Sequence, residues 1–306
     1  NADSIKLKSV IESLRKGKTI MHNEQKNITR PRIGLGSFAY RYAVGCEGFR
    51  PSQPMSTLDF LAAAHRMGFE SVQLCENLNY AKLSPDELLR VNEKAAQLGL
   101  VVELGMRDLT LENISYHLDL AELLSSSFLR VVLGKNRPTP EENPKALIDL
   151  SIQTLKAVLP RCQRQGVLIG IENHFDLCTN DLLTIVQAVN DPRVGMILDT
   201  TNCLGFVERP EETLKALSPY LLSIHLKDYL LKKVEAGYLI TGTVLGEGWL
   251  DAAGLLQQLC NLPRPLLSIV IELTIRRGEQ QTPEVVLTSE QAAIEKSLAF
   301  LRGIMA

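Results

Sequence analysis

Four hydrophobic runs of this sequence each end on a side chain that can bind a metal ion. The runs are Ile-Gly-Ile-Glu172, Ile-Leu-Asp199, Ser-Ile-His225 and Val-Ile-Glu272. Three carboxylates and one imidazole suit a divalent ion such as Mn²⁺, Mg²⁺, Co²⁺ or Zn²⁺. They can share one ion only if the fold brings the four run ends together, so the elements that carry them decide the function.

The four runs belong to a regular alternation of short apolar segments and longer amphipathic segments that begins at Arg32. Short runs that are apolar throughout are typical of parallel strands buried on both faces. We therefore predict eight strands, at 32–38, 71–75, 101–106, 128–133, 168–172, 194–199, 221–227 and 267–273.

Helix signals lie between these strands. For example, Ser84-Pro85-Asp86-Glu87 combines an N-cap residue, a first-turn proline and early acids. We predict helices at 57–67, 85–98, 112–124, 144–165, 180–190, 210–219, 251–261 and 288–303. Eight strands each followed by a helix predict a single α/β domain, a (β/α)₈ barrel over residues 32–306, preceded by a short basic N-terminal arm at 1–31. An open doubly wound sheet is the alternative, but Gly34-Leu-Gly36 matches only half of a dinucleotide-binding turn.

Composition and charge narrow the possible partners. The 306 residues are 45% hydrophobic and carry a formal net charge of −2, so no general attraction for nucleic acid or anionic membranes is expected. No apolar run is long enough to span a bilayer or to form a signal-peptide core. The six scattered cysteines indicate free thiols rather than disulfides. We expect a cytoplasmic protein without nucleic-acid or membrane partners, and the composition is compatible with a homo-oligomer as well as a monomer.

In such a barrel the active site lies at the C-terminal ends of the strands, where all four candidate ligands are predicted. Each residue also has a simpler interpretation. Asp199 could be a helix N-cap, and His225 could be a hydrogen-bonded core residue. Glu172 and Glu272 are harder to explain in that way, because each ends a buried run where an unpaired charge is costly.

The ordered set of these strand ends resembles the xylose isomerase-like barrel superfamily, especially its sugar phosphate isomerase/epimerase branch, over residues 32–303. The segments that carry the resemblance are Ile171-Glu172-Asn173, Leu198-Asp199-Thr200, His225-Leu-Lys227-Asp228 and Ile271-Glu272-Leu273. The resemblance implies that Glu172, Asp199, His225 and Glu272 hold one divalent ion. It also implies that Glu172 and Glu272 form the catalytic acid/base pair, which moves a proton while the ion stabilises an enediolate.

Other polar residues at the strand ends could contact a small sugar or sugar-acid substrate. These substrate-binding candidates are Glu76, Arg107, Lys135, Asn136, His174 and Lys227. Lys227 lies two residues beyond His225, so on a strand it points to the same side; it could bind a carboxylate or phosphate, donate a proton, or simply reach solvent. An inserted loop at 229–250 contains Gly246-Glu-Gly248-Trp, which could form a phosphate site or a mobile lid.

The leading hypothesis is an isomerase or epimerase of a small sugar or sugar acid. The alternative is a decarboxylase of a 3-oxo sugar acid, because Glu103-Leu-Gly-Met-Arg107 and Gly246-Glu-Gly-Trp-Leu-Asp251 look like a branch that includes such enzymes. There the enediolate would form by loss of CO₂, with Lys227 or Arg107 neutralising the carboxylate. An endonuclease IV-like hydrolase is less consistent with only five histidines. A non-catalytic barrel would leave buried acids repelling one another.

Overall fold

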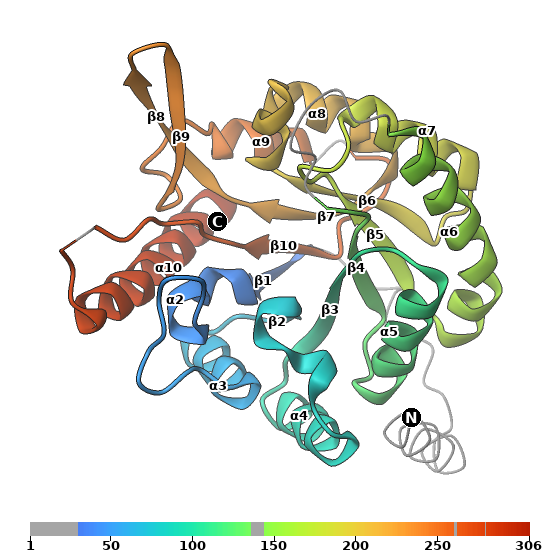
Figure 1. Ribbon diagram of the computed structural model, residues 1–306, viewed down its shortest axis with the longest axis horizontal. Helices are drawn as coiled ribbons and strands as arrows, with labels where there is room; N and C mark the ends of the chain where they lie inside the picture. Colours follow the sequence, from blue (N-terminus) through green and yellow to red (C-terminus); the bar gives the residue numbers. More distant parts are fainter. Residues whose placement is uncertain (1–29, 136–143, 260–261, 279) are drawn as a thin grey trace.

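The structure is a computed structural model that describes residues 30–135, 144–259, 262–278 and 280–306. Eight parallel strands form a closed barrel in the order β1-β10-β7-β6-β5-β4-β3-β2 (Figure 1). The barrel strands are β1 (Arg32–Gly36), β2 (Ser71–Leu74), β3 (Val101–Arg107), β4 (Phe128–Val132), β5 (Leu168–Glu172), β6 (Val194–Asp199), β7 (Leu221–Leu226) and β10 (Ser268–Ile271). This order confirms the predicted single (β/α)₈ barrel.

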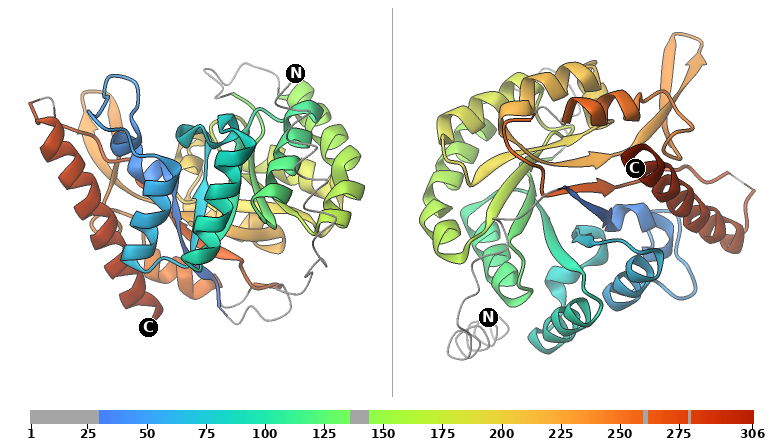
Figure 2. Two further views of the ribbon diagram at one scale, coloured as in Figure 1. Left: turned by 90° about the horizontal axis from the view of Figure 1, so that it is seen from below. Right: turned by 180° about the vertical axis from the view of Figure 1, so that it is seen from behind.

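Helices surround the barrel wall, as the views from below and behind show (Figure 2). They are α2 (Arg41–Val44), α3 (Thr57–Met67), α4 (Pro85–Gln97), α5 (Leu111–Leu123), α6 (Lys145–Gln165), α7 (Thr179–Val189), α8 (Pro210–Leu217), α9 (Ala252–Leu259) and α10 (Pro283–Met305). Short 3₁₀ turns are η2 (Ser37–Tyr40), η3 (Glu76–Leu78), η4 (Tyr80–Lys82), η5 (Asn202–Phe206) and η6 (Ser218–Tyr220).

Local sequence signals fix the helix starts. Ser56 and Ser84 each form a capping box with the acid three residues later, and Pro85 occupies the first turn of α4. The barrel strands form much of the buried core, because every residue of β4, β6 and β7 is buried. Strands buried on both faces explain why their sequences are apolar throughout. The barrel wall therefore holds its C-terminal ends rigidly.

Three segments differ from the sequence-based expectation. The last strand ends at Ile271, so Glu272 lies just beyond it. Helix α10 begins at Pro283, five residues before the predicted start, because Thr282 caps it and the proline opens it. The inserted segment at 229–250 is mostly an antiparallel hairpin, β8 (Asp228–Val234) and β9 (Gly237–Thr243), joined by a tight turn at 235–236.

Other predictions can be checked only where the structure describes the chain. The five cysteines in that part are all free thiols, as expected. Within the same residues, no helix is both long enough and apolar enough to cross a bilayer. Nearly all of the proposed arm at 1–31 lies outside the described residues, so the arm stays a prediction.

Candidate metal and substrate site

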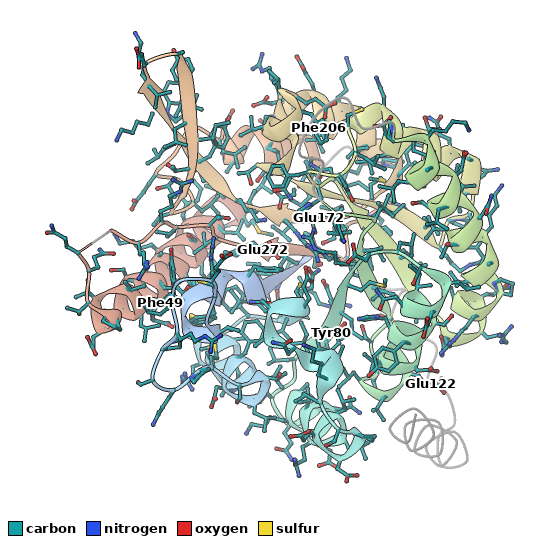
Figure 3. The ribbon with its side chains drawn as sticks, in the orientation of Figure 1. Phe49, Tyr80, Glu122, Glu172, Phe206 and Glu272 are labelled. Carbon is teal, nitrogen blue, oxygen red and sulfur yellow. The ribbon has the colours of Figure 1, made fainter. Side chains whose placement is uncertain are left out.

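The four predicted ligands meet at one end of the barrel. Glu172 ends β5, Asp199 ends β6, His225 lies near the end of β7, and Glu272 directly follows β10. Asp199 and His225 are partners in the β6–β7 register. All four side chains are buried, and Figure 3 shows Glu172 and Glu272 near the barrel centre. Gly36 makes room for the Glu272 side chain, because a Cβ at position 36 would lie 2.6 Å from Glu272 Cγ.

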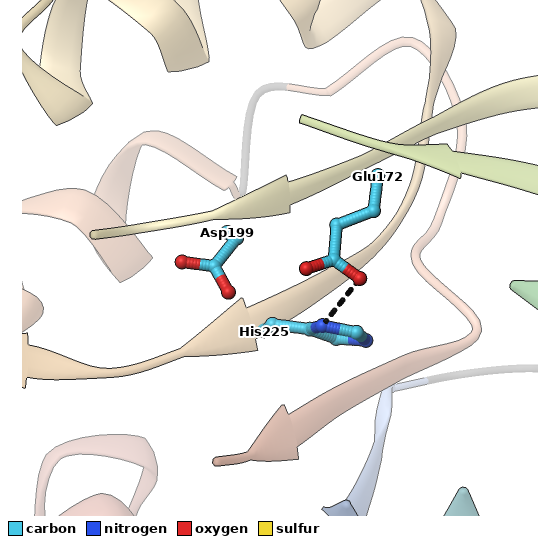
Figure 4. A group of neighbouring side chains, drawn as sticks. All are labelled: Glu172, Asp199 and His225. Carbon is cyan, nitrogen blue, oxygen red and sulfur yellow. Dashed lines mark ion pairs between the residues drawn. The ribbon is translucent and has the colours of Figure 1, made fainter. Parts of the chain in front are cut away.

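Three of the four ligands form a compact group. Ligand atoms of Glu172, Asp199 and His225 lie within 4.8 Å of one another (Figure 4). His225 Nδ1 is 3.3 Å from Glu172 Oε2 and 3.8 Å from Glu272 Oε1. Glu272 is not part of the compact group, although it borders the same imidazole.

Two buried cations neutralise part of this acidic group. Lys227 Nζ lies 2.6 Å from Asp199 Oδ2 and 2.9 Å from Glu272 Oε2. The Arg130 guanidinium donates to Glu172 and also lies 3.2 Å from Glu76 Oε2. Lys227 thus points toward the ligands, as its spacing from His225 predicts, and does not simply reach solvent. Its side chain is only 13% exposed.

The pKa values follow from this balance of burial and charge. Burial would raise the pKa of Glu172, but Arg130 and His225 hold it well below its ordinary value. Burial likewise opposes ionisation of Glu272, yet Lys227 keeps its pKa lowered. Burial would lower the pKa of His225, and the two glutamates raise it instead. Burial would also lower the pKa of Lys227, but Asp199 and Glu272 outweigh it and the pKa is raised.

Neighbouring groups orient the carboxylates. Asp199 Oδ1 accepts hydrogen bonds from the backbone N–H groups of Thr201 (2.9 Å) and Asn202 (3.0 Å). The Asn202 side chain in turn donates to Glu172 Oε1 at 3.0 Å. Asn173 accepts from the Asp199 backbone and donates to its carbonyl oxygen. Contacts of this kind fix the direction in which a ligand presents its lone pairs.

The donor set fits a divalent ion. Both His225 ring nitrogens and Glu272 Oε1 are buried and lack a hydrogen-bond partner within the described residues. Such atoms are costly unless something binds them. Within the described residues, the carboxylates of Glu172, Asp199 and Glu272 pair with Lys227 and Arg130, and with His225 when its ring is protonated. With the ring neutral, as a metal ligand must be, one negative charge is left unbalanced. A divalent ion there would bind the unpartnered atoms and make the site net positive.

A cavity of about 570 Å³ opens over this group. Among the predicted substrate-binding residues, Arg107, His174 and Lys227 line it. Arg107 Nη2 lies 3.2 Å from His174 Nε2, and burial lowers the pKa of His174 to about 3, so its ring is neutral at ordinary pH. A small sugar or sugar acid matches a cavity of this size.

The other three substrate-binding candidates fit less well. Glu76 does not line the cavity; it joins Arg107 (3.3 Å) to Arg130 (3.2 Å) and so positions two cations. Lys135 is exposed beyond β4 and also does not line the cavity. Asn136 lies outside the described residues. Contact of Glu76 and Lys135 with a substrate therefore stays a prediction.

The glycine-rich part of the inserted segment, at 246–250, binds a carboxylate of the protein itself rather than forming the predicted phosphate site. The backbone N–H groups of Gly246 and Gly248 donate to Asp228 Oδ2 at 2.9 and 3.0 Å, and that of Leu250 donates to Oδ1 at 3.0 Å. These backbone N–H groups would have to donate to a phosphate, but they already donate to the buried carboxylate of Asp228. The phosphate-site interpretation of this loop is not supported, and Asp228 is the residue that holds it.

Two residues of the site escaped sequence analysis. Arg130 lies inside the apolar strand Phe-Leu-Arg130-Val-Val, and Asn202 lies in η5. A single arginine in a run buried on both faces is itself a signal, because a buried charge requires a partner. Asn202 carried no comparable signal, since an asparagine three residues after a strand is also an ordinary turn residue.

With this fold and site, the chain belongs to the xylose isomerase-like TIM barrel family, whose pattern matches residues 61–304. It is similar to a 3-oxo-isoapionate decarboxylase of Pectobacterium atrosepticum, with 28% identity over 242 residues that cover 78% of this chain and 84% of the relative.

Solved structures with the same fold include a D-psicose 3-epimerase with D-fructose, at 12% identity and a TM-score of 0.68 over 89% of this chain and 99% of that one. Another is a Mycobacterium smegmatis barrel in complex with magnesium, at 17% identity and a TM-score of 0.62 over 87% of this chain and 98% of that one. At these identities the likeness shows the fold alone.

Proposed function

We propose that this protein is a divalent-metal-dependent decarboxylase of a small 3-oxo sugar acid. The observation that carries the proposal is the Lys227 ammonium among the ligand carboxylates, at 2.6 Å from Asp199 and 2.9 Å from Glu272. Together with Arg107 it gives the cavity two cations that a neutral ketose does not need and a substrate carboxylate does. The 28% identical relative, named as a 3-oxo-isoapionate decarboxylase, supports the same choice.

An ion held by Glu172, Asp199, His225 and Glu272 would polarise the 3-oxo oxygen and stabilise the negative charge that develops on it. Arg107 and Lys227 would hold the substrate carboxylate at the barrel mouth. The bond between the carboxylate carbon and C2 then breaks, its electron pair passes into the 3-oxo group, CO₂ leaves, and C2 takes up one proton. Solvent in the cavity can supply that proton, since Lys227 stays charged beside Asp199 and Glu272.

Isomerisation or epimerisation of a sugar remains the second candidate, because Glu172 and Glu272 both border His225 and could act as an acid/base pair. That chemistry requires a carboxylate to remove a carbon-bound proton. Burial would raise the pKa values of both carboxylates. Arg130 nevertheless keeps the pKa of Glu172 low, and Lys227 keeps the pKa of Glu272 low. Loss of CO₂ needs no such base, so it does not depend on either carboxylate being free to accept a proton.

The Mn²⁺-loaded protein should be incubated in D₂O with 3-oxo-isoapionate and, separately, with D-psicose and D-fructose. Decarboxylation predicts CO₂ release and one deuterium at C2 of the product, and no carbon-bound exchange in either ketose. Lys227→Met should abolish the release, while the matched Lys232→Met, on exposed β8, should not. Ketose exchange without CO₂ release would assign the isomerase instead, and neither activity would reject both.

A further inference from the structure

The hairpin formed by β8 and β9 projects from the barrel (Figures 1 and 2). Its exposed side chains include several large apolar ones. Five of the twelve exposed large hydrophobic residues in the described chain lie on it: Leu230, Val234, Tyr238, Leu239 and Ile240. Tyr238 is 68% exposed. Clustered exposure of this kind marks an interaction surface, whereas single exposed apolar residues do not.

The two edges of the hairpin differ in charge. Strand β8 carries Lys232 and Lys233, which discourage pairing with another strand. Strand β9 reads Gly237-Tyr-Leu-Ile-Thr-Gly-Thr243 and contains neither a charged residue nor a proline. Edge strands without such protection readily pair with another strand, and an isolated two-stranded hairpin is only marginally stable in water. The β9 edge is therefore the part of the hairpin that is suited to pairing.

The free length of that edge defines the possible register. Gly242 already bridges Ile275 in a parallel pair, and residues 237–241 have no other strand partner than β8 among the described residues. The middle residue of this stretch is Leu239. If a second β9 runs antiparallel to the first, Leu239 meets its own counterpart on a two-fold axis. Tyr238 then pairs with Ile240 of the other copy on each side.

We propose that two copies of this chain pair through β9 to form a continuous four-stranded sheet, β8-β9-β9-β8, with Leu239 at the two-fold axis. Such an interface is self-complementary, because the same edge serves both copies. The lysines of β8 remain on the outer strands, in water. The apolar side chains divide between the two faces of the hairpin, with Leu239 on one and Tyr238 and Ile240 on the other. That division suits pairing along a strand edge better than binding to a membrane surface, which requires one apolar face.

The pairing also brings the second copy to the substrate cavity. Ile240, Gly242 and Tyr229 line that cavity and share one face of the hairpin, since alternate residues of a strand point to one side. Residues directly opposite each other in an antiparallel pair have neighbouring side chains. The partner subunit's Tyr238 therefore lies beside Ile240 on this face. Each subunit thus extends the cavity wall of the other.

Sedimentation velocity of the full chain tests the interface without substrate, so its outcome is separate from that of the proposed reaction. The expected species has twice the 33.9 kDa chain mass. Leu239→Lys places two like charges face to face and should weaken dimerisation at least about tenfold. Leu230→Lys makes the same change on β8 and should leave the mass unchanged. Circular dichroism confirms that both variants fold.

Disulfide trapping tests the register. Leu239→Cys should cross-link under mild oxidation, because opposed residues at a two-fold in this geometry have Cα atoms about 4.5 Å apart, within reach of a disulfide. Lys232→Cys on the outer strand and the unmodified protein, with its native cysteines, should not. Equal cross-linking at both positions, or a monomer at all concentrations, would overturn the proposal. A monomer that co-sediments with phosphatidylserine vesicles would assign the hairpin to a membrane instead.

Discussion

The ammonium nitrogen of Lys227 lies 2.6 Å from Asp199 Oδ2, a buried carboxylate at the end of β6. It also lies 2.9 Å from Glu272 Oε2. These oxygens belong to two of the four proposed metal ligands, so the lysine and a divalent ion interact with the same acids. Like charges at short range disfavour each other, and burial makes that effect larger than in water.

Removing this ammonium should strengthen metal binding and abolish turnover. We expect Lys227→Met to bind Mn²⁺ at least about tenfold more tightly than the unmodified protein, equivalent to roughly 1.4 kcal/mol, because one positive charge leaves the site. Titration calorimetry measures the affinity. Lys232→Met changes the same charge at an exposed position and should bind Mn²⁺ as the unmodified protein does. Weaker binding by the Lys227→Met variant would show that the lysine assists the ion.

Arg130 should matter for stability chiefly because of Glu172. Arg130→Met leaves that buried carboxylate without its guanidinium, so the free energy of unfolding should fall by about 3–5 kcal/mol. In the double variant with Glu172→Gln the loss should be clearly smaller than the sum of the two single losses, because the unpaired charge is gone. Urea unfolding without added metal measures all four proteins. Additive losses would contradict the coupling.

Asp228 should control the order of the segment after the hairpin. Its carboxylate accepts from the backbone N–H groups of Tyr229, Gly246, Gly248 and Leu250. Asp228→Ala leaves these amides unpaired and should lower the free energy of unfolding by about 3 kcal/mol. Hydrogen exchange at 244–250 should accelerate more than exchange in β5. Unchanged protection at 244–250 would show that other contacts hold the loop.

Glu290 on α10 should give the protein a defined pH dependence. It accepts from the backbone N–H groups of Tyr42 and Ala43, and burial raises its pKa to about 7. The folded state therefore keeps a proton that the unfolded state loses above about pH 4.3. The protonated Glu290 stabilises the folded state by on the order of 3 kcal/mol. This contribution to the free energy of unfolding is fully present below about pH 4.3 and is lost as the pH rises toward 7.

Replacing the carboxyl removes this titration. Glu290→Gln should match the unmodified protein in unfolding free energy near pH 4 and exceed it at pH 8, since the amide cannot ionise. Glu295→Gln, an exposed position on the same helix, should keep the original pH profile. Parallel profiles for the Glu290→Gln variant and the unmodified protein would mean that Glu290 does not titrate in this range.

The fold and the candidate ligands were accessible from the sequence because both depend on local patterns. Uniformly apolar runs identified the eight strands, and the barrel rule then put Glu172, Asp199, His225 and Glu272 at one end. The spacing of Lys227 from His225 likewise predicted its direction. What these residues share is that their position along a strand determines where they point.

The remaining features depend on contacts between distant segments. Arg130 reaches Glu172 across 42 residues, and Glu76 turns toward Arg107 and Arg130 rather than into the cavity. Neither direction follows from the local sequence, because η3 redirects the chain after β2. The sequence analysis predicted a loop where β8 and β9 form a hairpin. Their alternation of apolar and polar residues is short, and β8 carries lysines.

Anomalous diffraction from crystals grown with Mn²⁺ would locate a divalent ion at the barrel end. We expect a single strong manganese peak bounded by Glu172, Asp199, His225 and Glu272, and its loss in crystals of His225→Ala. A peak elsewhere, or no peak at saturating Mn²⁺ with the four side chains ordered, would contradict this expectation.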